Sequence, residues 1–292
     1  MKNFVFSIIF VLCMGFSAFS QNFEDGFNPA YANKRGVYLL PQAGDFAIGV
    51  DATPFLSFVG NIFTSGANTP PLFDGVNQTI YGKYFVQDFR AVRVRLTLNM
   101  SNNTIKGEVA DDVKQSATPQ DPDAILFDAQ KLSYSYVEIG AGYEVRRGNG
   151  RVQGFWGGEV FFGVSNEKEK YEYANNMTTN NQTPSTYSFP GYNNRLSTSE
   201  RVTERKPDSN IFAGLGTFVG IEYFVAPQIS IGGEFGLGFM FRSSAQSEST
   251  SERWNSTDNK KEINTETNPY WDSNQFEFFS RTSGHIFMMF HF

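Results

Sequence analysis

The sequence predicts an all-β fold, namely a transmembrane, antiparallel, up-and-down β-barrel of eight strands with short periplasmic turns and long extracellular loops. Three observations support this prediction. Apolar and polar residues alternate at every second position along most of the chain, as they do in strands with two unlike faces. The connections alternate between tight turns and long polar stretches. The chain ends in the apolar string HIFMMFHF, where soluble proteins usually have a polar tail.

The first twenty residues have the organisation of a secretory signal peptide. A single lysine is followed by an apolar run over 4–16 and then by small residues. This run is shorter than the roughly 20 residues that a membrane-spanning helix needs, so we expect cleavage of residues 1–20. The only cysteine, Cys13, would leave with them. Residues 21–43 would then form a short N-terminal periplasmic segment.

Composition excludes several classes of protein. The formal net charge of −6 argues against nucleic acid as a partner. An exported chain without disulfides needs a large core, repeated backbone pairing or a membrane for stability. No later stretch approaches 18 consecutive apolar residues, which excludes helical membrane spans. The many glycines and aromatic residues instead fall into alternating strings.

The barrel is predicted over 44–292. Alternation is clearest in FRAVRVRLTLN, where Val92 and Val94 share one face and Arg93 and Arg95 the other. The predicted strands are 44–60, 77–86, 89–102, 131–146, 151–166, 209–225, 228–243 and 276–292.

The connections support the barrel more strongly than the strands do. Tight turns are predicted at 87–88, 147–150 and 226–227. Long polar stretches are predicted at 61–76, 103–130, 167–208 and 244–275. Such long connections are unusual in a compact soluble domain but typical of the external loops of an outer-membrane barrel. Sequence around the last two stretches also alternates, so two interpretations stay open: the sheet continues into them, or they are polar surface loops.

A soluble β-sandwich or a lipocalin-like barrel is the alternative fold, and it would place the apolar face inside. The glycines on the polar face help to decide between the two. Side chains this small cannot build a soluble core, whereas a narrow lumen can accept them. These glycines are Gly140, Gly142, Gly157, Gly163, Gly214, Gly216, Gly220, Gly232, Gly236 and Gly238.

The last strand carries a resemblance to a known family. Its apolar face consists of Ile286, Met288, Phe290 and Phe292. A terminal aromatic residue preceded by alternate apolar positions, together with a signal peptide, resembles the bacterial outer-membrane β-barrel family, especially the small barrels of the OmpA and OmpX type. Segments such as GKYFVQDFRAVRVRL and GRVQGFWGGEV look like those of barrels from Bacteroidota envelopes. The resemblance implies an outer-membrane location, contact with its lipid and lipopolysaccharide, and recognition of the last strand by the barrel-insertion machinery.

If the apolar faces meet lipid, the charged side chains point into the lumen. An eight-stranded barrel is just wide enough for side chains to fill, and buried charges need partners. We therefore expect Arg93 and Arg95 to pair with glutamates of other strands and plug the lumen. Inward phenylalanines at 155, 161, 218 and 224 would fill it further. The predicted lumen charge network is Asp51, Lys83, Arg93, Arg95, Glu138, Glu144, Glu159, Glu222, Glu234 and Arg281.

These features predict a structural or interaction protein, an accessory subunit of a larger envelope complex that contacts its partner through the extracellular loops or residues 21–43. The first alternative is a small channel lined by the same charges. The second is a lipid-modifying enzyme, for which Ser283 and His285 are the candidate nucleophile and base on the last strand. We expect no enzyme and no cofactor. No metal site is expected either, because the acidic run ADDVKQSATPQDPDA lacks the glycine and glutamate of a calcium loop.

Overall fold

The computed structural model describes residues 38–52, 78–117, 119–148, 150–197, 199–207, 209–268 and 273–292. The predicted signal peptide, most of the segment 21–43 and residues 53–60 of the first predicted strand lie outside this part of the chain. The side chains of 268 and 280–285 also lie outside it.

The fold is an all-β sheet of twelve strands in which every pairing is antiparallel, with the four-residue helix α3 (Asp112–Gln115). This confirms the predicted all-β, antiparallel class. The strands are β1 (Phe46–Asp51), β2 (Gln78–Gln87), β3 (Arg90–Ala110), β4 (Ile125–Arg147), β5 (Val152–Glu172), β6 (Arg195–Ser197), β7 (Glu200–Lys206), β8 (Ser209–Ala226), β9 (Ile229–Ser244), β10 (Ser247–Asn255), β11 (Lys260–Asn268) and β12 (Ser273–His291).

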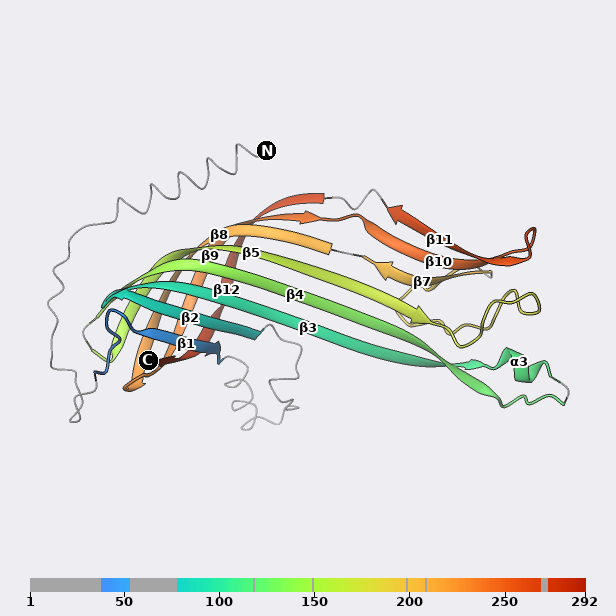
Figure 1. Cartoon of the computed structure of the whole chain (residues 1–292), viewed down its shortest axis with the longest axis horizontal. Helices are drawn as coiled ribbons and strands as arrows, with labels where there is room; N and C mark the ends of the chain where they lie inside the picture. The colour runs from blue at the N-terminus through green and yellow to red at the C-terminus, as the bar shows by residue number, and fades with distance from the viewer. Residues whose placement is uncertain are drawn as a thin grey trace.

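Eight of these strands pair in a cycle, which we call the ring (Figure 1). The pairing runs β5-β4-β3-β2-β1-β12-β9-β8, and β8 pairs again with β5. The ring is uneven, because β4 has 23 residues and β1 has only six. Each ring strand overlaps one of the eight predicted strands. Local alternation of apolar and polar residues therefore predicted where the strands lie. Which strands pair with each other to close the ring is seen only in the structure.

The three predicted tight turns are present at one end of the ring. They connect β2 to β3, β4 to β5 and β8 to β9. Gly148 and Gln228 adopt left-handed backbone conformations in these turns, with φ of 130° and 68°. Glycine adopts this conformation without steric cost, and a Cβ on Gly148 would lie 2.8 Å from the Val152 carbonyl oxygen.

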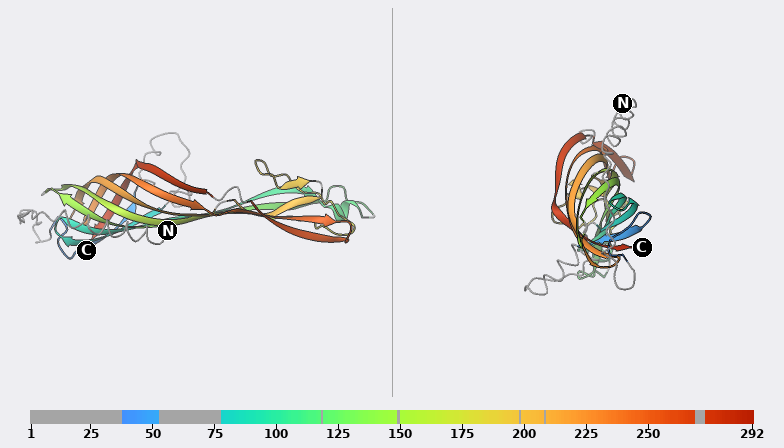
Figure 2. Two further views of the ribbon diagram at one scale, coloured as in Figure 1. Left: turned by 90° about the horizontal axis from the view of Figure 1, so that it is seen from above. Right: turned by 90° about the vertical axis from the view of Figure 1, so that its left-hand side faces the viewer.

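At the other end, three ring strands continue into a second body of sheet, which we call the extension (Figure 2). Here β3, β4 and β5 are joined by further strands in the order β11-β10-β7-β5-β4-β3, and β6 pairs with β7. The predicted polar stretches 103–130, 167–208 and 244–275 are therefore partly strand. The sheet interpretation holds for the last two, whereas the prediction of a loop over 103–130 was too long because β3 and β4 remain paired as far as Ala110 and Ile125.

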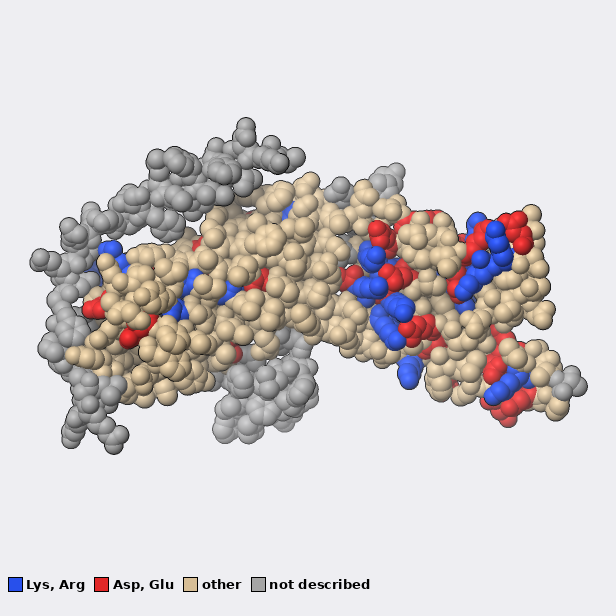
Figure 3. Space-filling model, in the orientation of Figure 1, with Lys and Arg blue, Asp and Glu red and all other residues tan. Residues whose placement is uncertain are grey.

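The two faces of the ring differ in chemistry. The outer face exposes large apolar side chains on every ring strand, whereas the inner face buries charged and aromatic ones. Most of the ring surface is uncharged in Figure 3, and lysine, arginine, aspartate and glutamate gather over the extension. Outward-facing apolar residues include Ile48, Ile80, Val94, Ile139, Val160, Val219, Leu237 and Phe290.

Candidate functional site

The inner face of the ring brings together nearly all of the predicted lumen charge network. These side chains come from seven strands and are at most 7% exposed. The period of two places them there, because side chains of one parity along a strand share a face. The side chain of Arg281 lies outside the described part of the chain. The network members that are buried are Asp51, Lys83, Arg93, Arg95, Glu138, Glu144, Glu159, Glu222 and Glu234.

Near the turn end of the ring, two cations and two carboxylates form a closed set of ion pairs. Lys83 Nζ lies 2.9 Å from Glu144 Oε2 and 3.4 Å from Glu222 Oε2. Arg146 contacts the same two carboxylates at 2.8 and 2.7 Å. Each charge thus has two opposite neighbours, which offsets the large cost of removing it from water.

Arg93 and Arg95 extend the network toward the extension. Arg93 donates two hydrogen bonds to the Glu234 carboxylate, at 2.8 and 3.0 Å, in the bidentate geometry that suits a guanidinium. Arg95 Nη2 lies 2.5 Å from Glu138 Oε1 and 2.9 Å from Glu159 Oε1. Both arginines therefore pair with glutamates from other strands.

Two members of this cluster are not in the predicted lumen charge network. Arg146 has the parity of Glu144 but was taken as the last residue before a turn, although that parity could have identified it. His291 has the inward parity of Phe287 and Met289, and its Nε2 lies 3.0 Å from Ser230 Oγ and 3.2 Å from Glu222 Oε1. A catalytic relay would hold the acid at Nδ1, whereas here both partners meet Nε2 and both are fully buried.

Aromatic rings fill the interior between the charges, and glycines make room for them. Phe155 lies opposite Gly220, and Phe287 lies opposite Gly232 across neighbouring strands. A Cβ on either glycine would fall within 2.3 Å of the facing ring. The glycine-rich inner face thus provides the space for the aromatic rings. The predicted inward phenylalanines 155, 161, 218 and 224 are all buried.

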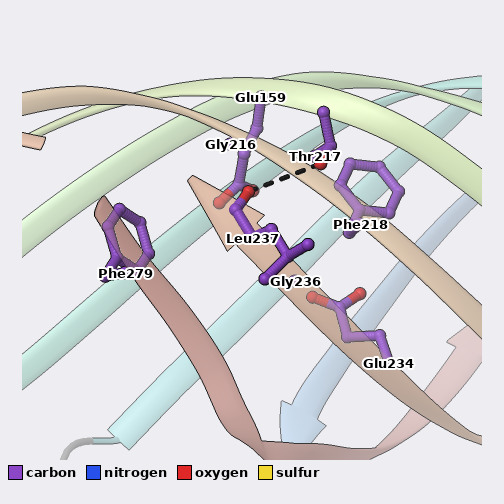
Figure 4. Close-up of a pocket in the computed structure, with 8 residues that line it drawn as sticks. All are labelled: Glu159, Gly216, Thr217, Phe218, Glu234, Gly236, Leu237 and Phe279. Atoms are coloured by element: carbon purple, nitrogen blue, oxygen red, sulfur yellow. Dashed lines mark hydrogen bonds between the residues drawn. The ribbon is translucent and has the colours of Figure 1, made fainter. Parts of the chain in front are cut away.

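The charged and aromatic groups also contact each other. The Arg93 guanidinium lies 3.8 Å from the centroid of the Phe218 ring, and Lys83 Nζ lies 4.8 Å from that of Phe155. Such contacts attract a cation to the ring face. A small cavity of about 10 Å³ lies between Glu159, Glu234 and Phe279 (Figure 4). It has room for about one water molecule.

The last strand alternates as predicted where its side chains are described. Phe287, Met289 and His291 point inward and are buried, whereas Phe290 and Phe292 are exposed. The Phe292 ring stacks on Phe46 of β1 at a centroid distance of 5.1 Å. The side chains of Ser283 and His285 lie outside the described residues, so their predicted role as an alternative catalytic pair stays a prediction.

In the extension, the connection from β5 to β6 packs against the sheet. The buried carboxylate of Asp128 accepts hydrogen bonds from the backbone N–H groups of Ala174 and Tyr187, both at 2.9 Å. Tyr171, Phe189 and Val202 form a small apolar cluster beside it. Buried polar and apolar contacts therefore hold the connection against the sheet, and it forms part of the folded surface of the extension.

Tyr173 belongs to the same packing. Its hydroxyl donates to the Val202 carbonyl oxygen at 2.5 Å, and the Arg201 guanidinium lies 4.1 Å from its ring centroid. Burial raises the pKa of Tyr173 to about 12, because the phenolate would be poorly solvated here. The neutral phenol is thus the form that the fold stabilises.

Two further observations on the described residues bear on other functions. They contain no helix that is both long and apolar enough to cross a membrane. No group of three or more histidine, cysteine, aspartate or glutamate side chains is arranged to hold a metal ion in the same part of the chain.

The chain has distant structural similarity to solved proteins. The chain is similar to a solved structure of a major outer membrane protein from Thermus thermophilus, with 12% sequence identity, 86% of this chain and 100% of that chain covered, and a TM-score of 0.35. No protein-family model matches the sequence, and no curated protein matches it.

Proposed function

We propose that this chain is an outer-membrane β-barrel whose ring crosses the lipid, whose lumen is plugged and whose extension is an extracellular interaction surface. One observation carries the proposal: the ring exposes apolar side chains outward and buries its charges inward. Water would favour the reverse arrangement, because exposed charges are solvated and a large exposed apolar surface is not. Lipid favours the arrangement that the ring has.

The pairing of the strands supports a membrane location. Backbone groups in the hydrocarbon region need partners, so a sheet crosses it only when it closes on itself. The cyclic pairing of the eight ring strands meets this requirement at the level where the six-residue β1 joins β12 to β2. Seven of these strands have ten or more residues, which is enough for a tilted crossing. The tight turns then face the periplasm and the extension faces outward.

The packing of the lumen favours a plug over the alternative of a small channel. Four cations and five glutamates form contacts across the ring, and aromatic rings fill the space between them. The cavity beside Glu159 is too small for an ion with its hydration shell. We expect the purified protein to give no current steps in a planar bilayer. A reproducible open-channel current would favour the channel instead.

The extension supports an interaction role in a larger envelope complex. It is a folded surface with a buried cluster around Tyr171, and it reaches well beyond the ring. Purification in mild detergent after crosslinking, with and without deletion of the hairpin 247–268, tests this role. We expect a protein of the envelope to co-purify with the intact chain and to be lost with the hairpin. Recovery of an uncrosslinked monomer from both would contradict the accessory-subunit role.

The last strand is proposed to guide insertion of the barrel. Its exposed Phe290 and Phe292 offer an apolar face next to β1, with which β12 pairs. A chain lacking Phe292 is expected to assemble more slowly into the outer membrane, measured by the appearance of the compact, detergent-resistant form on gels. An unchanged assembly rate would contradict a role of the last strand in insertion.

A further inference from the structure

A band of neutral polar side chains crosses the inner face where the ring passes into the extension. Neighbours in the band are partners in the strand register, from Asn99 through to Ser244. All five side chains are half-buried. They are amides, hydroxyls and a phenol, which both donate and accept hydrogen bonds. The polar band consists of Asn99, Tyr136, Ser165, Asn210 and Ser244.

One cation beside the polar band lacks the partners that the lumen cations have. Arg242 is half-buried on β9, between Phe212 and Gln275 in the register. Its Nε is buried and has no hydrogen-bond partner within the described part of the chain. Among the described residues, no carboxylate lies within the 4.0 Å of an ion pair with it. Glu277, on the same face of β12, is the nearest such group in the register and does not reach it.

The contrast with the four lumen cations points to an external ligand. Lys83, Arg93, Arg95 and Arg146 each contact two or more glutamates. A partly desolvated guanidinium without an anion is costly for the fold. A planar guanidinium also binds a carboxylate through two parallel hydrogen bonds. Arg242 is thus the one described inner-face cation whose pairing an incoming anion would complete.

Aromatic side chains next to Arg242 add a second kind of contact. The rings of Tyr136 and Phe212 stack at a centroid distance of 5.4 Å, and Tyr134, further out on β4, is 38% exposed. The electron-rich face of an aromatic ring packs well against the C–H groups of a sugar ring. The polar band already contains hydrogen bonds, from Tyr136 to Glu138, from Asn210 to Ser165 and from Ser244 to Asn210. Sugar hydroxyls also donate and accept, so they would exchange with bonds of this kind.

The strand pairing argues against a peptide as the ligand. A peptide is commonly captured by adding a strand to a sheet edge. Around Arg242, however, β4, β5, β8 and β9 are each paired on both sides. Their backbone groups are already used, so a ligand must be held by side chains. The cavity of about 10 Å³ below is too small to admit it, so the ligand would lie on the polar band.

We propose that Arg242 and the polar band bind an oligosaccharide that carries a carboxylate. Arg242 pairs with the carboxylate, the polar band hydrogen-bonds the hydroxyls, and the aromatic pair supports one ring. The inference rests on the proposed function in one respect only: that function sets the side of the membrane from which the ligand reaches Arg242.

The test is titration calorimetry of the full chain in detergent micelles with trigalacturonate as the probe. The methyl ester of trigalacturonate is the matched uncharged probe, and a triglutamate peptide represents the other ligand class. Arg242→Gln removes the charge at the site. Arg253→Gln is the control, because Arg253 is an exposed arginine of the extension that pairs with Glu262. Folding of each variant is checked independently by its compact migration on gels.

We expect trigalacturonate to bind, and the ester and Arg242→Gln each to weaken binding by about tenfold or more, as expected for loss of a charge-assisted contact. Arg253→Gln should leave the affinity unchanged. The inference is overturned if the folded protein fails to bind trigalacturonate at millimolar concentration, if Arg242→Gln binds as tightly, or if triglutamate binds equally well. Failure of the chain to form the compact species would instead count against the barrel itself.

Discussion

Replacing Arg93 by methionine should destabilise the ring strongly. Arg93 is 2% exposed, and its two hydrogen bonds at 2.8 and 3.0 Å are the ion-pair contacts of Glu234. The other carboxylates near Arg93 keep a second cation, since Glu144 contacts Lys83 and Glu159 contacts Arg95. The substitution therefore leaves the buried carboxylate of Glu234 without its cation. Loss of one partner of a buried ion pair costs about 3 to 5 kcal/mol.

The double variant Arg93→Met/Glu234→Gln separates this cost from a general loss of packing. It removes both charges while keeping similar shapes, and exchange of a buried pair for uncharged groups is often nearly neutral. We expect the double variant to be more stable than Arg93→Met by about 3 kcal/mol, roughly a hundredfold in the folding equilibrium. The assay is reversible urea unfolding in lipid vesicles, followed on gels. Equal stability of the single and double variants would refute the reasoning, and Arg253→Met is the exposed control.

Three further predictions follow from other parts of the molecule. Val94→Arg, on the outer face, should lower the stability in vesicles by about 2 to 4 kcal/mol if this position lies near the membrane midplane; no loss there would count against lipid contact. Asp128→Ala should expose the β5–β6 connection to protease without changing the unfolding of the ring, because its two backbone donors lose their acceptor; equal protection would contradict this. The raised pKa of Tyr173, about 12, means that its contribution is complete below about pH 10, the ordinary value, and is lost as the pH rises through 12. Ultraviolet titration of tyrosinate should lack this late step in Tyr173→Phe, and an identical titration curve would refute the assignment.

The sequence predicted the faces of the ring well because a strand's period of two is a local property. Arg93 and Arg95 could be placed inside from the valines beside them. Their partners could not be chosen, because Glu234 lies on β9 and only the register around the ring brings it to Arg93. Arg146 was missed because the predicted turn began next to it, although its parity with Glu144 was available.

The extension was less predictable for a physical reason. Its strands have polar residues on both faces, and weakly contrasted faces do not separate a strand from a surface loop. Contacts such as Asp128 with Ala174 and Tyr187 join distant parts of the chain, and no local pattern encodes them. Arg242 was likewise read only as strand sequence. That no described carboxylate pairs with it becomes visible once the register places Phe212 and Gln275 on either side.

The most direct test of a lipid-facing ring is a spin-label scan along β3, from Val92 to Lys106, in vesicles. Single cysteines are introduced into a chain without Cys13, the only cysteine present. Oxygen dissolved in the hydrocarbon should relax labels at outward positions up to Leu98, and a water-soluble nickel complex should reach only labels beyond it. The inward positions Arg93 and Arg95 are left unlabelled, because they carry buried ion pairs of the ring. Access of the nickel complex to Val92 and Val94 would contradict a ring embedded in the membrane.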